Sequence, residues 1–152
     1  MYHVNMRLAS FEDAEAIYKL LCTIADLHRE ARPDMFPNLV SKYTVEQIKE
    51  LLNKKNHAIF VAEYNDEVAG YVFCEIITEG VGATLYVDDL CVDAEARKMG
   101  IGKALMDMAV EYGRETGCRQ LMLNVWEFNS GAISFYEKYG LTTRTRHMEM
   151  TL

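Results

Sequence analysis

The sequence predicts a mixed α/β (α+β) domain in which helices cover one mostly antiparallel central sheet. Three β-rich runs follow one another directly between residues 58 and 93, an order that favours antiparallel pairing of neighbouring strands. A strand–helix–strand unit then spans residues 83–126, and such a crossover makes its two strands parallel. The predicted order is β-α-α-β-β-β-α-β-α-β-β, with about seven strands and about four helices.

The first half of the chain is expected to hold one strand and two helices. Residues 3–8 alternate in polarity and predict the strand. Ser10 then has the character of a helix N-cap, and the apolar residues Ile17, Leu20, Leu21, Ile24 and Leu27 recur at helical spacing as far as about Arg29. Both prolines lie in the loop that follows, and Thr44 is expected to cap a second helix through about Asn53.

The second half supplies the rest of the sheet. Two β-rich runs, 58–64 and 68–77, flank a turn at Asn65-Asp66-Glu67, and a third strand covers 83–93. An amphipathic helix is predicted from about Gly100 to Glu115, followed by a strand at 120–126. A last helix runs from about Ser130 to Tyr139, where Gly140 ends it. The tail from Thr142 predicts one or two closing strands.

Length and charge narrow the class of protein. The 152 residues show no repeat or linker and predict a single domain over residues 1–152. A net charge of −7 argues against a nucleic-acid partner. Without the blocks of a secretion signal or an apolar run long enough to span a bilayer, the chain is expected to be cytoplasmic, with no membrane partner. The scattered cysteines and histidines predict free thiols and no metal.

The segment RKMGIG, residues 97–102, opens the long helix directly after the strand that ends near Val92. Glycines there let a ligand approach the backbone, and free amides at a helix N-terminus suit a phosphate or pyrophosphate. The spacing matches neither common nucleotide loop. Arg97 and Ala104 replace the first Gly and the Ser or Thr of a Walker A loop, and Leu105 replaces the last Gly of the dinucleotide fingerprint. A plain glycine-rich helix start is the alternative interpretation.

Two motifs resemble those of the GNAT superfamily of N-acetyltransferases. R-x-x-G-x-G after L-C-V-D is similar to the family's coenzyme A motif, and LNVWEFNSGAISFYEKYGL is similar to its later motif. The resemblance covers nearly the whole chain. It implies the GNAT fold and direct transfer of the acetyl group of acetyl-CoA to a primary amine, with acetyl-CoA as cosubstrate and no covalent enzyme intermediate.

The resemblance also implies positions for the coenzyme. Backbone groups of Leu90, Cys91 and Val92 are expected to pair with the pantetheine arm. The pyrophosphate is expected to lie against the loop and first helical turn, formed by Arg97, Lys98, Met99, Gly100, Ile101, Gly102, Lys103 and Ala104. Asn129 is expected either to touch the coenzyme or to position the later helix. Tyr136 matches the tyrosine that protonates the departing thiolate, although it could instead only pack beneath the helix.

A carboxylate is the expected aid to amine deprotonation. Asp88 holds a position used in several family members, but it could also be a solvated strand residue. Because neighbours in a strand point to opposite faces, only one of Asp88 and Asp89 is expected to face the substrate. Glu75 is a reserve candidate. Cys91 has no histidine beside it to activate a thiolate and is expected to line the site only.

The acceptor is expected to be a small cationic amine, in keeping with the acidic charge balance. Acetylation of a protein N-terminus or lysine is an alternative, as is a non-catalytic coenzyme A-binding module. The resemblance implies that the loop between the first two helices and the strand after the last helix grip the acceptor. In that loop Met35 and Phe36 could form an apolar wall and Asp34 or Glu30 could meet the amine, or these residues could equally cap the core. By family analogy the chain is expected to form a homodimer.

Overall fold

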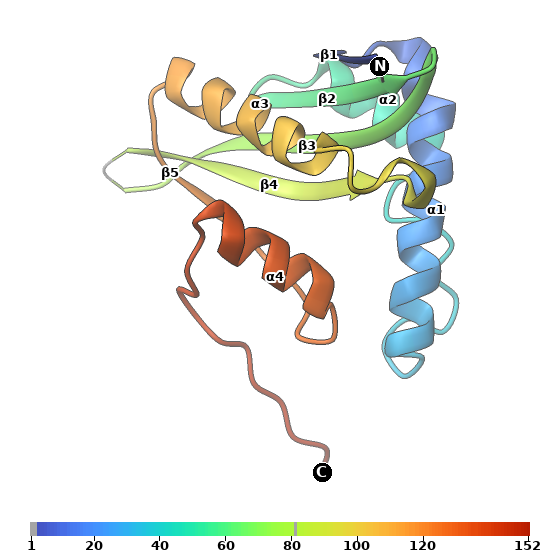
Figure 1. The fold of residues 1–152 in the computed structure, drawn as a ribbon. Coiled ribbons are helices and arrows are strands. Elements are labelled where there is room, and N and C mark those ends of the chain that lie inside the picture. The colour runs from blue at the N-terminus through green and yellow to red at the C-terminus, as the bar shows by residue number, and fades with distance from the viewer. Residues whose placement is uncertain (1–2, 81) are drawn as a thin grey trace.

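The computed structural model describes residues 3–80 and 82–152. It contains one sheet of five strands in the order β1-β2-β3-β4-β5 (Figure 1). The strands are β1 (Val4–Leu8), β2 (His57–Tyr64), β3 (Glu67–Thr78), β4 (Ala83–Val92) and β5 (Cys118–Leu123). The first four pair antiparallel, and β5 pairs parallel to β4. This arrangement confirms the predicted mixed, mostly antiparallel sheet.

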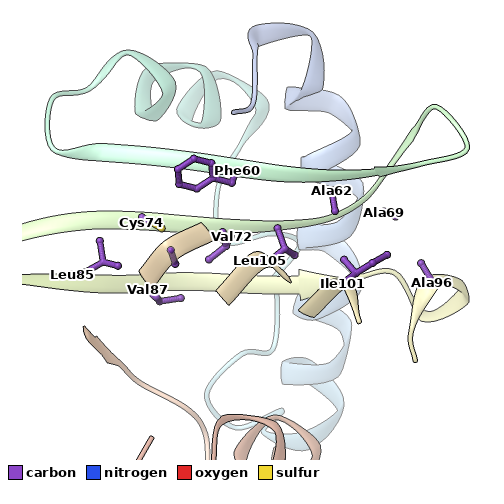
Figure 2. Close-up of a cluster of buried hydrophobic side chains, with 11 residues drawn as sticks. Phe60, Ala62, Ala69, Val72, Cys74, Leu85, Val87, Ala96, Ile101 and Leu105 are labelled. Carbon is purple, nitrogen blue, oxygen red and sulfur yellow. The ribbon is translucent and has the colours of Figure 1, made fainter. Parts of the chain in front are cut away.

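Helices cover both faces of the sheet. They are α1 (Ala14–Ala31), α2 (Val45–Asn53), α3 (Ile101–Glu115) and α4 (Ser130–Tyr139), with single 3-10 turns η1 (Phe11–Asp13) and η2 (Ala94–Ala96). Buried residues of α1 and α2 pack with one set of strand side chains, and those of α3 pack with the alternate set (Figure 2). The two-residue period of the strands therefore divides the core into two layers.

Local capping explains why the helices begin and end where they do. The Thr44 hydroxyl accepts from the Gln47 amide at 3.1 Å, while the Gln47 side chain accepts from the Thr44 amide at 2.9 Å. This reciprocal pair is a capping box and starts α2 as predicted. Gly140 has φ of +122° and ends α4. Asn65 and Asp66 both have positive φ, which suits the tight turn of the β2–β3 hairpin.

The expected number of strands was too high. The sheet has five strands instead of about seven, because residues 141–152 adopt no regular structure and pair with no strand in the part of the chain described. An extended segment becomes a strand only where a partner completes its backbone hydrogen bonds. The four cysteines are free thiols, as predicted, and among the described residues no helix is both long and apolar enough to cross a membrane.

A β-bulge interrupts the pairing of β3 with β4. Phe73 lies opposite Asp89 and Cys74 lies opposite Val87, so Asp88 is an extra residue in β4 without a counterpart in β3. At the same height β4 also leaves β5, since the parallel register ends at Val87 and Leu123. From the bulge to its end, β4 is therefore paired along the β3 edge alone in the described part of the chain.

An ion cluster ties β1 to the start of α1. Arg7 donates to both carboxylate oxygens of Asp13, at 2.7 and 2.9 Å, and to Glu63 at 2.5 Å. Asp13 is buried, and its carboxylate also accepts from the Ser10 amide at 2.7 Å. The hydrogen bonds from Arg7 hold the pKa of Asp13 below its usual range. The cluster therefore stabilises the fold above the pH at which an unfolded aspartate ionises.

Arg7→Met is expected to lower the free energy of unfolding by about 2 kcal/mol at pH 7, because it leaves the buried carboxylate of Asp13 without its cation. Urea unfolding measures the change. The loss should shrink as pH falls and Asp13 takes up a proton. Lys103→Met breaks an exposed pair with Asp107 and should cost under about 0.5 kcal/mol. Equal losses in the two variants would contradict the structural role of Arg7.

Candidate active site

The end of β4 forms the floor of the candidate site. Val72, Tyr71 and Gly70 of β3 pair with Leu90, Cys91 and Val92 on one edge. The opposite edge faces the gap opened where β5 diverges after Val87. A strand edge left in this way presents amide and carbonyl groups to an extended ligand, as in strand addition. The three residues that the sequence assigned to the pantetheine arm lie at this edge.

The loop after β4 is built to expose backbone. Lys98 and Gly100 both have positive φ, at 67° and 78°, and the curve they make leads into α3. Ile101 is buried and Met99 packs against the same core, so their side chains anchor the loop from inside. The first intrahelical bond runs from the Ala104 amide to the Gly100 carbonyl at 3.0 Å. The amides of residues 101–103 therefore have no helical acceptor and suit an anion.

Side chains around this loop limit what else can enter it. A Cβ on Gly102 would lie 3.3 Å from two ring atoms of Phe135, so α4 packs closely over the helix start. Arg97 donates from Nε to the Val92 carbonyl at 3.4 Å, and its guanidinium remains exposed beside the loop. Lys103 is exposed and pairs with Asp107 at 2.9 Å. The loop thus combines free amides with nearby positive charge.

A groove continues from the loop between α3 and α4. Its lining includes the rings of Phe135 and Tyr139, the cations Lys103, Arg114 and Lys138, and the carboxylates of Asp107 and Glu111. The Tyr139 hydroxyl donates to Asp107 at 2.7 Å and so joins the two helices across the groove. Aromatic and cationic side chains together suit a phosphorylated nucleoside.

The two aspartates of β4 have different partners. Asp88 accepts from Lys42 Nζ at 3.0 Å and from the Tyr43 hydroxyl at 2.5 Å, so it anchors the segment before α2. Asp89 accepts from the Tyr71 hydroxyl at 3.2 Å. Burial raises the pKa of Asp89, and the positive charge of Lys42 offsets this only in part. A raised pKa makes a carboxylate a better proton acceptor near neutral pH.

The two aspartates do not point to opposite faces of the sheet, as regular strand alternation predicts. The bulge adds one residue to β4, which cancels one step of the strand's alternation. Asp88 and Asp89 both contact residues on the α1–α2 side, through Tyr43 and Tyr71 respectively. Glu75, the reserve candidate, lies 3.8 Å from His57 in β2.

Tyr136 of α4 lies near Asp89 and Cys91 of β4. Burial raises its pKa to about 12, and the nearby carboxylate of Asp89 adds to the shift. The hydroxyl therefore stays protonated through neutral pH and can donate a proton or hydrogen bond. Asn129 caps α4, since its side chain accepts from the Ala132 amide at 3.2 Å. This residue thus positions the helix that carries Tyr136.

Cys91 is unsuited to covalent catalysis. Its side chain is buried, and burial raises the pKa of the thiol to about 12. The reactive form of cysteine is the thiolate, which such burial disfavours. Among the described residues, no group of three or more His, Cys, Asp or Glu side chains is placed to hold a metal ion.

Four rings form an aromatic cluster: His28 of α1, Phe36 of the following loop, and Trp126 and Phe128 before α4. The ring of His28 meets those of Phe36, Trp126 and Phe128 edge-on, with centroids 5.5, 6.3 and 5.5 Å away. His28 Nδ1 lies 2.8 Å from the Ile24 carbonyl, an arrangement in which Nδ1 donates and Nε2 can accept. Trp126 and Phe128 remain 37% exposed, so the cluster presents an apolar surface.

Sequence reasoning identified only one ring of this cluster. Phe36 lies where an apolar wall was expected, whereas Met35 is exposed and Asp34 is paired with Arg32 at 2.8 Å. His28, Trp126 and Phe128 were missed as site residues, as were Tyr43 and Tyr71. Trp126 and Phe128 stand two positions apart just after a predicted strand, a pattern that places both rings on one face. The pattern does not show that both rings contact His28.

The family model of the acetyltransferase (GNAT) family matches residues 23–141, which include the whole candidate site. The chain belongs to the acetyltransferase (GNAT) family. Within this GNAT chain, the matched region runs from α1 to the end of α4.

Two curated relatives frame the comparison. An uncharacterised N-acetyltransferase of Methanocaldococcus jannaschii is 34% identical over 95 residues, which cover 60% of this GNAT chain and 42% of the relative. The chain therefore spans less than half the length of that protein. The thialysine N-epsilon-acetyltransferase of Caenorhabditis elegans is 27% identical over 124 residues, which cover 81% of this chain and 77% of the relative.

Solved structures share the fold. A mutant of the BH1408 protein of Bacillus halodurans superposes with a TM-score of 0.92 at 22% identity, covering 97% of this chain and 99% of that one. At 22% identity, this similarity shows a shared fold and nothing about the activity of the chain.

Proposed function

We propose that this protein transfers the acetyl group of acetyl-CoA directly to a primary amine on a small cationic molecule. The observation that carries the proposal is the free edge of β4 beyond the bulge, which leads straight into the amide-rich start of α3. A strand edge followed by an anion site suits an extended pantetheine arm that ends in a pyrophosphate. The groove between α3 and α4 would receive the nucleoside end.

The thioester of acetyl-CoA supplies the acetyl group, and three groups of the protein manage charge and protons. Asp89 accepts the proton that the attacking amine loses as its C–N bond forms. Free backbone amides near Val92 donate to the carbonyl oxygen, where negative charge grows. The Tyr136 hydroxyl donates its proton to sulfur as the C–S bond breaks. Asp88 does not move a proton in this scheme, because Lys42 and Tyr43 already engage both of its carboxylate oxygens.

The acceptor would approach from the aromatic cluster. A positive charge on the His28 ring would oppose the rise in the pKa of Asp89, so the cluster and the proposed base lie within electrostatic range. Aromatic faces beside a carboxylate suit a cationic amine with an apolar stem. The C. elegans relative is named for thialysine, which agrees with this class, whereas an Escherichia coli relative, 26% identical over 121 residues, is named for the alanine of a ribosomal protein and represents the protein-acetylating alternative.

A panel of acceptors tests the proposal. Thiol release from acetyl-CoA would be measured with lysine analogues and diamines, and in parallel with peptides that carry a free N-terminus or lysine. Faster turnover of the small amines is expected. Faster turnover of peptides would favour the protein-acetylating alternative. Binding without turnover of any amine would favour a coenzyme A-binding module.

Tyr136→Phe is expected to lower kcat about 100-fold by removing the proton donor to sulfur. The affinity for acetyl-CoA, measured by calorimetry, should stay within a factor of about two because the ring is retained. As the pKa of Tyr136 is about 12, its protonation should not limit the wild-type rate below pH 10. An unchanged kcat would leave Tyr136 with a packing role only.

A further inference from the structure

The segment that leads into α2, residues 41–44, holds the bulge of β4 in place. Asp88 is the extra residue of that bulge, and the parallel pairing with β5 ends one residue earlier, at Val87. The backbone carbonyl of Asp88 accepts from Lys42 Nζ at 2.8 Å. Because a bulge interrupts the regular ladder, the polar groups of its extra residue need partners from elsewhere. Lys42 is such a partner, and it comes from outside the sheet.

Two further contacts fasten the same residue. Lys42 Nζ also donates to Asp88 Oδ1 at 3.0 Å, and the Tyr43 hydroxyl donates to Oδ2 at 2.5 Å. The Tyr43 ring stacks on Phe73 of β3, with centroids 5.7 Å apart and planes 5° from parallel. Phe73 lies opposite Asp89 in the pairing of β3 with β4. The segment before α2 therefore grips both strands at the position of the proposed base.

The titratable groups that face Asp89 come from several elements: Tyr71 of β3, Asp88 and Cys91 of β4, His28 of α1, Tyr136 of α4, and Lys42 and Tyr43 before α2. Burial raises the pKa of Asp89, and the positive charge of Lys42 is the strongest influence that lowers it. The charge of Asp88 raises this pKa further, while a protonated His28 would add a smaller lowering effect. Lys42 is therefore the main cation that offsets the burial of the Asp89 carboxylate.

We propose that Lys42 is a positioning residue, which fixes the β4 bulge and supplies the positive charge that keeps the Asp89 carboxylate available as a proton acceptor. The inference rests on the proposed acetyl transfer, in which the proton lost by the amine goes to Asp89. Lys42 keeps its own proton throughout and acts through Asp88 and Asp89. Without its charge, a larger share of Asp89 would be protonated near neutral pH and unable to accept the proton of the amine.

Substitutions of Lys42 in the full chain test this role. Lys42→Gln removes the charge but keeps a hydrogen-bond donor on the side chain, whereas Lys42→Arg keeps the charge. Carbon NMR would follow the titration of the Asp89 carboxyl group, with its resonance assigned by its loss in Asp89→Asn. The pH dependence of kcat would be measured on the same samples. Lys49→Met, which removes an exposed charge of α2, is the matched control.

Lys42→Gln should move the titration midpoint of Asp89 and the acid limb of the rate to higher pH together. Because loss of the cation favours the protonated carboxyl group, the rate on the acid limb should fall about 3- to 10-fold. The affinity for acetyl-CoA should stay within a factor of about two, since the loss concerns proton transfer. Lys42→Arg and Lys49→Met should both keep the wild-type midpoint.

The NMR titration needs no turnover, so it separates this inference from the proposed reaction. A raised Asp89 midpoint in Lys42→Gln supports the control of Asp89 by Lys42 even if no amine is acetylated, a result that would count against the reaction alone. An unmoved midpoint in a folded Lys42→Gln would overturn the inference, as would a loss of rate that is equal at every pH. If the glutamine variant fails to fold, Lys42→Met gives the same comparison.

Discussion

Asp89→Asn is expected to lower kcat by about 100- to 10,000-fold, the range that a positioned general base contributes. The affinity for acetyl-CoA should change little, because the side chain meets the amine and not the coenzyme. Since burial raises the pKa of Asp89, the wild-type rate should fall on acidification at a pH above that of an ordinary aspartate. The acid limb of the pH–rate profile should be absent from the variant.

The matched comparison is Asp88→Asn, one residue away in the same bulge. It removes charge from the contact with Lys42 and Tyr43 and should cost less than about 10-fold, since a positioning residue acts indirectly. The acid limb should be retained. A larger loss in Asp88→Asn, together with a displaced acid limb, would return the base to Asp88.

The Asp89→Asn substitution should also stabilise the fold. The raised pKa of Asp89 means that its ionised form is less favourable in the folded chain than in the unfolded one. At neutral pH this lowers the free energy of unfolding, and the loss vanishes at a pH where both states are protonated. Asp89→Asn should therefore raise the thermal midpoint at pH 7 but not at pH 3. A lower midpoint at pH 7 would show that the Asp89 carboxylate stabilises the fold.

Gly102→Val is expected to weaken acetyl-CoA binding by about 100-fold or more, equivalent to the loss of two charge-assisted hydrogen bonds. The new Cβ would lie 3.3 Å from the Phe135 ring, and the valine methyls would crowd the start of α3, where the free amides lie. Calorimetric titration with acetyl-CoA measures the change. Far-UV circular dichroism should show an unchanged helix content.

Gly102→Ala provides a graded control at the same position. Its single methyl can be accommodated by a few tenths of an ångström of movement in Phe135, so its effect should lie between those of wild type and valine. Folded valine and alanine variants with wild-type affinity would place the pyrophosphate elsewhere.

Most element boundaries could be predicted because short-range chemistry determines them. Thr44 caps α2, Asn65 and Asp66 form the hairpin turn, and Gly140 ends α4, all through contacts within a few residues. The loop at Gly100 could be predicted for the same reason, because the positive φ of this residue favours glycine.

Long-range pairing could not be read in the same way. The bulge at Asp88 depends on how β3 aligns with β4, and the sequence of β4 alone predicts regular alternation. Regular alternation put the two aspartates on opposite faces of the sheet and did not predict the hydrogen bond from Tyr71 to Asp89. The aromatic cluster joins His28 to Trp126 across nearly the whole chain. The tail has a strand-like sequence, but a strand also needs a partner, and none pairs with it among residues 3–80 and 82–152.

Calorimetric titration of acetyl-CoA into the purified protein tests the central claim most directly. The free edge of β4 and the amides at the start of α3 predict one site per chain, with a dissociation constant of about 1–100 μM, typical of working substrate affinities. A subsequent thiol-release assay with a small amine would then show turnover. No detectable heat or binding at millimolar acetyl-CoA would contradict the assignment of this edge and loop to the coenzyme.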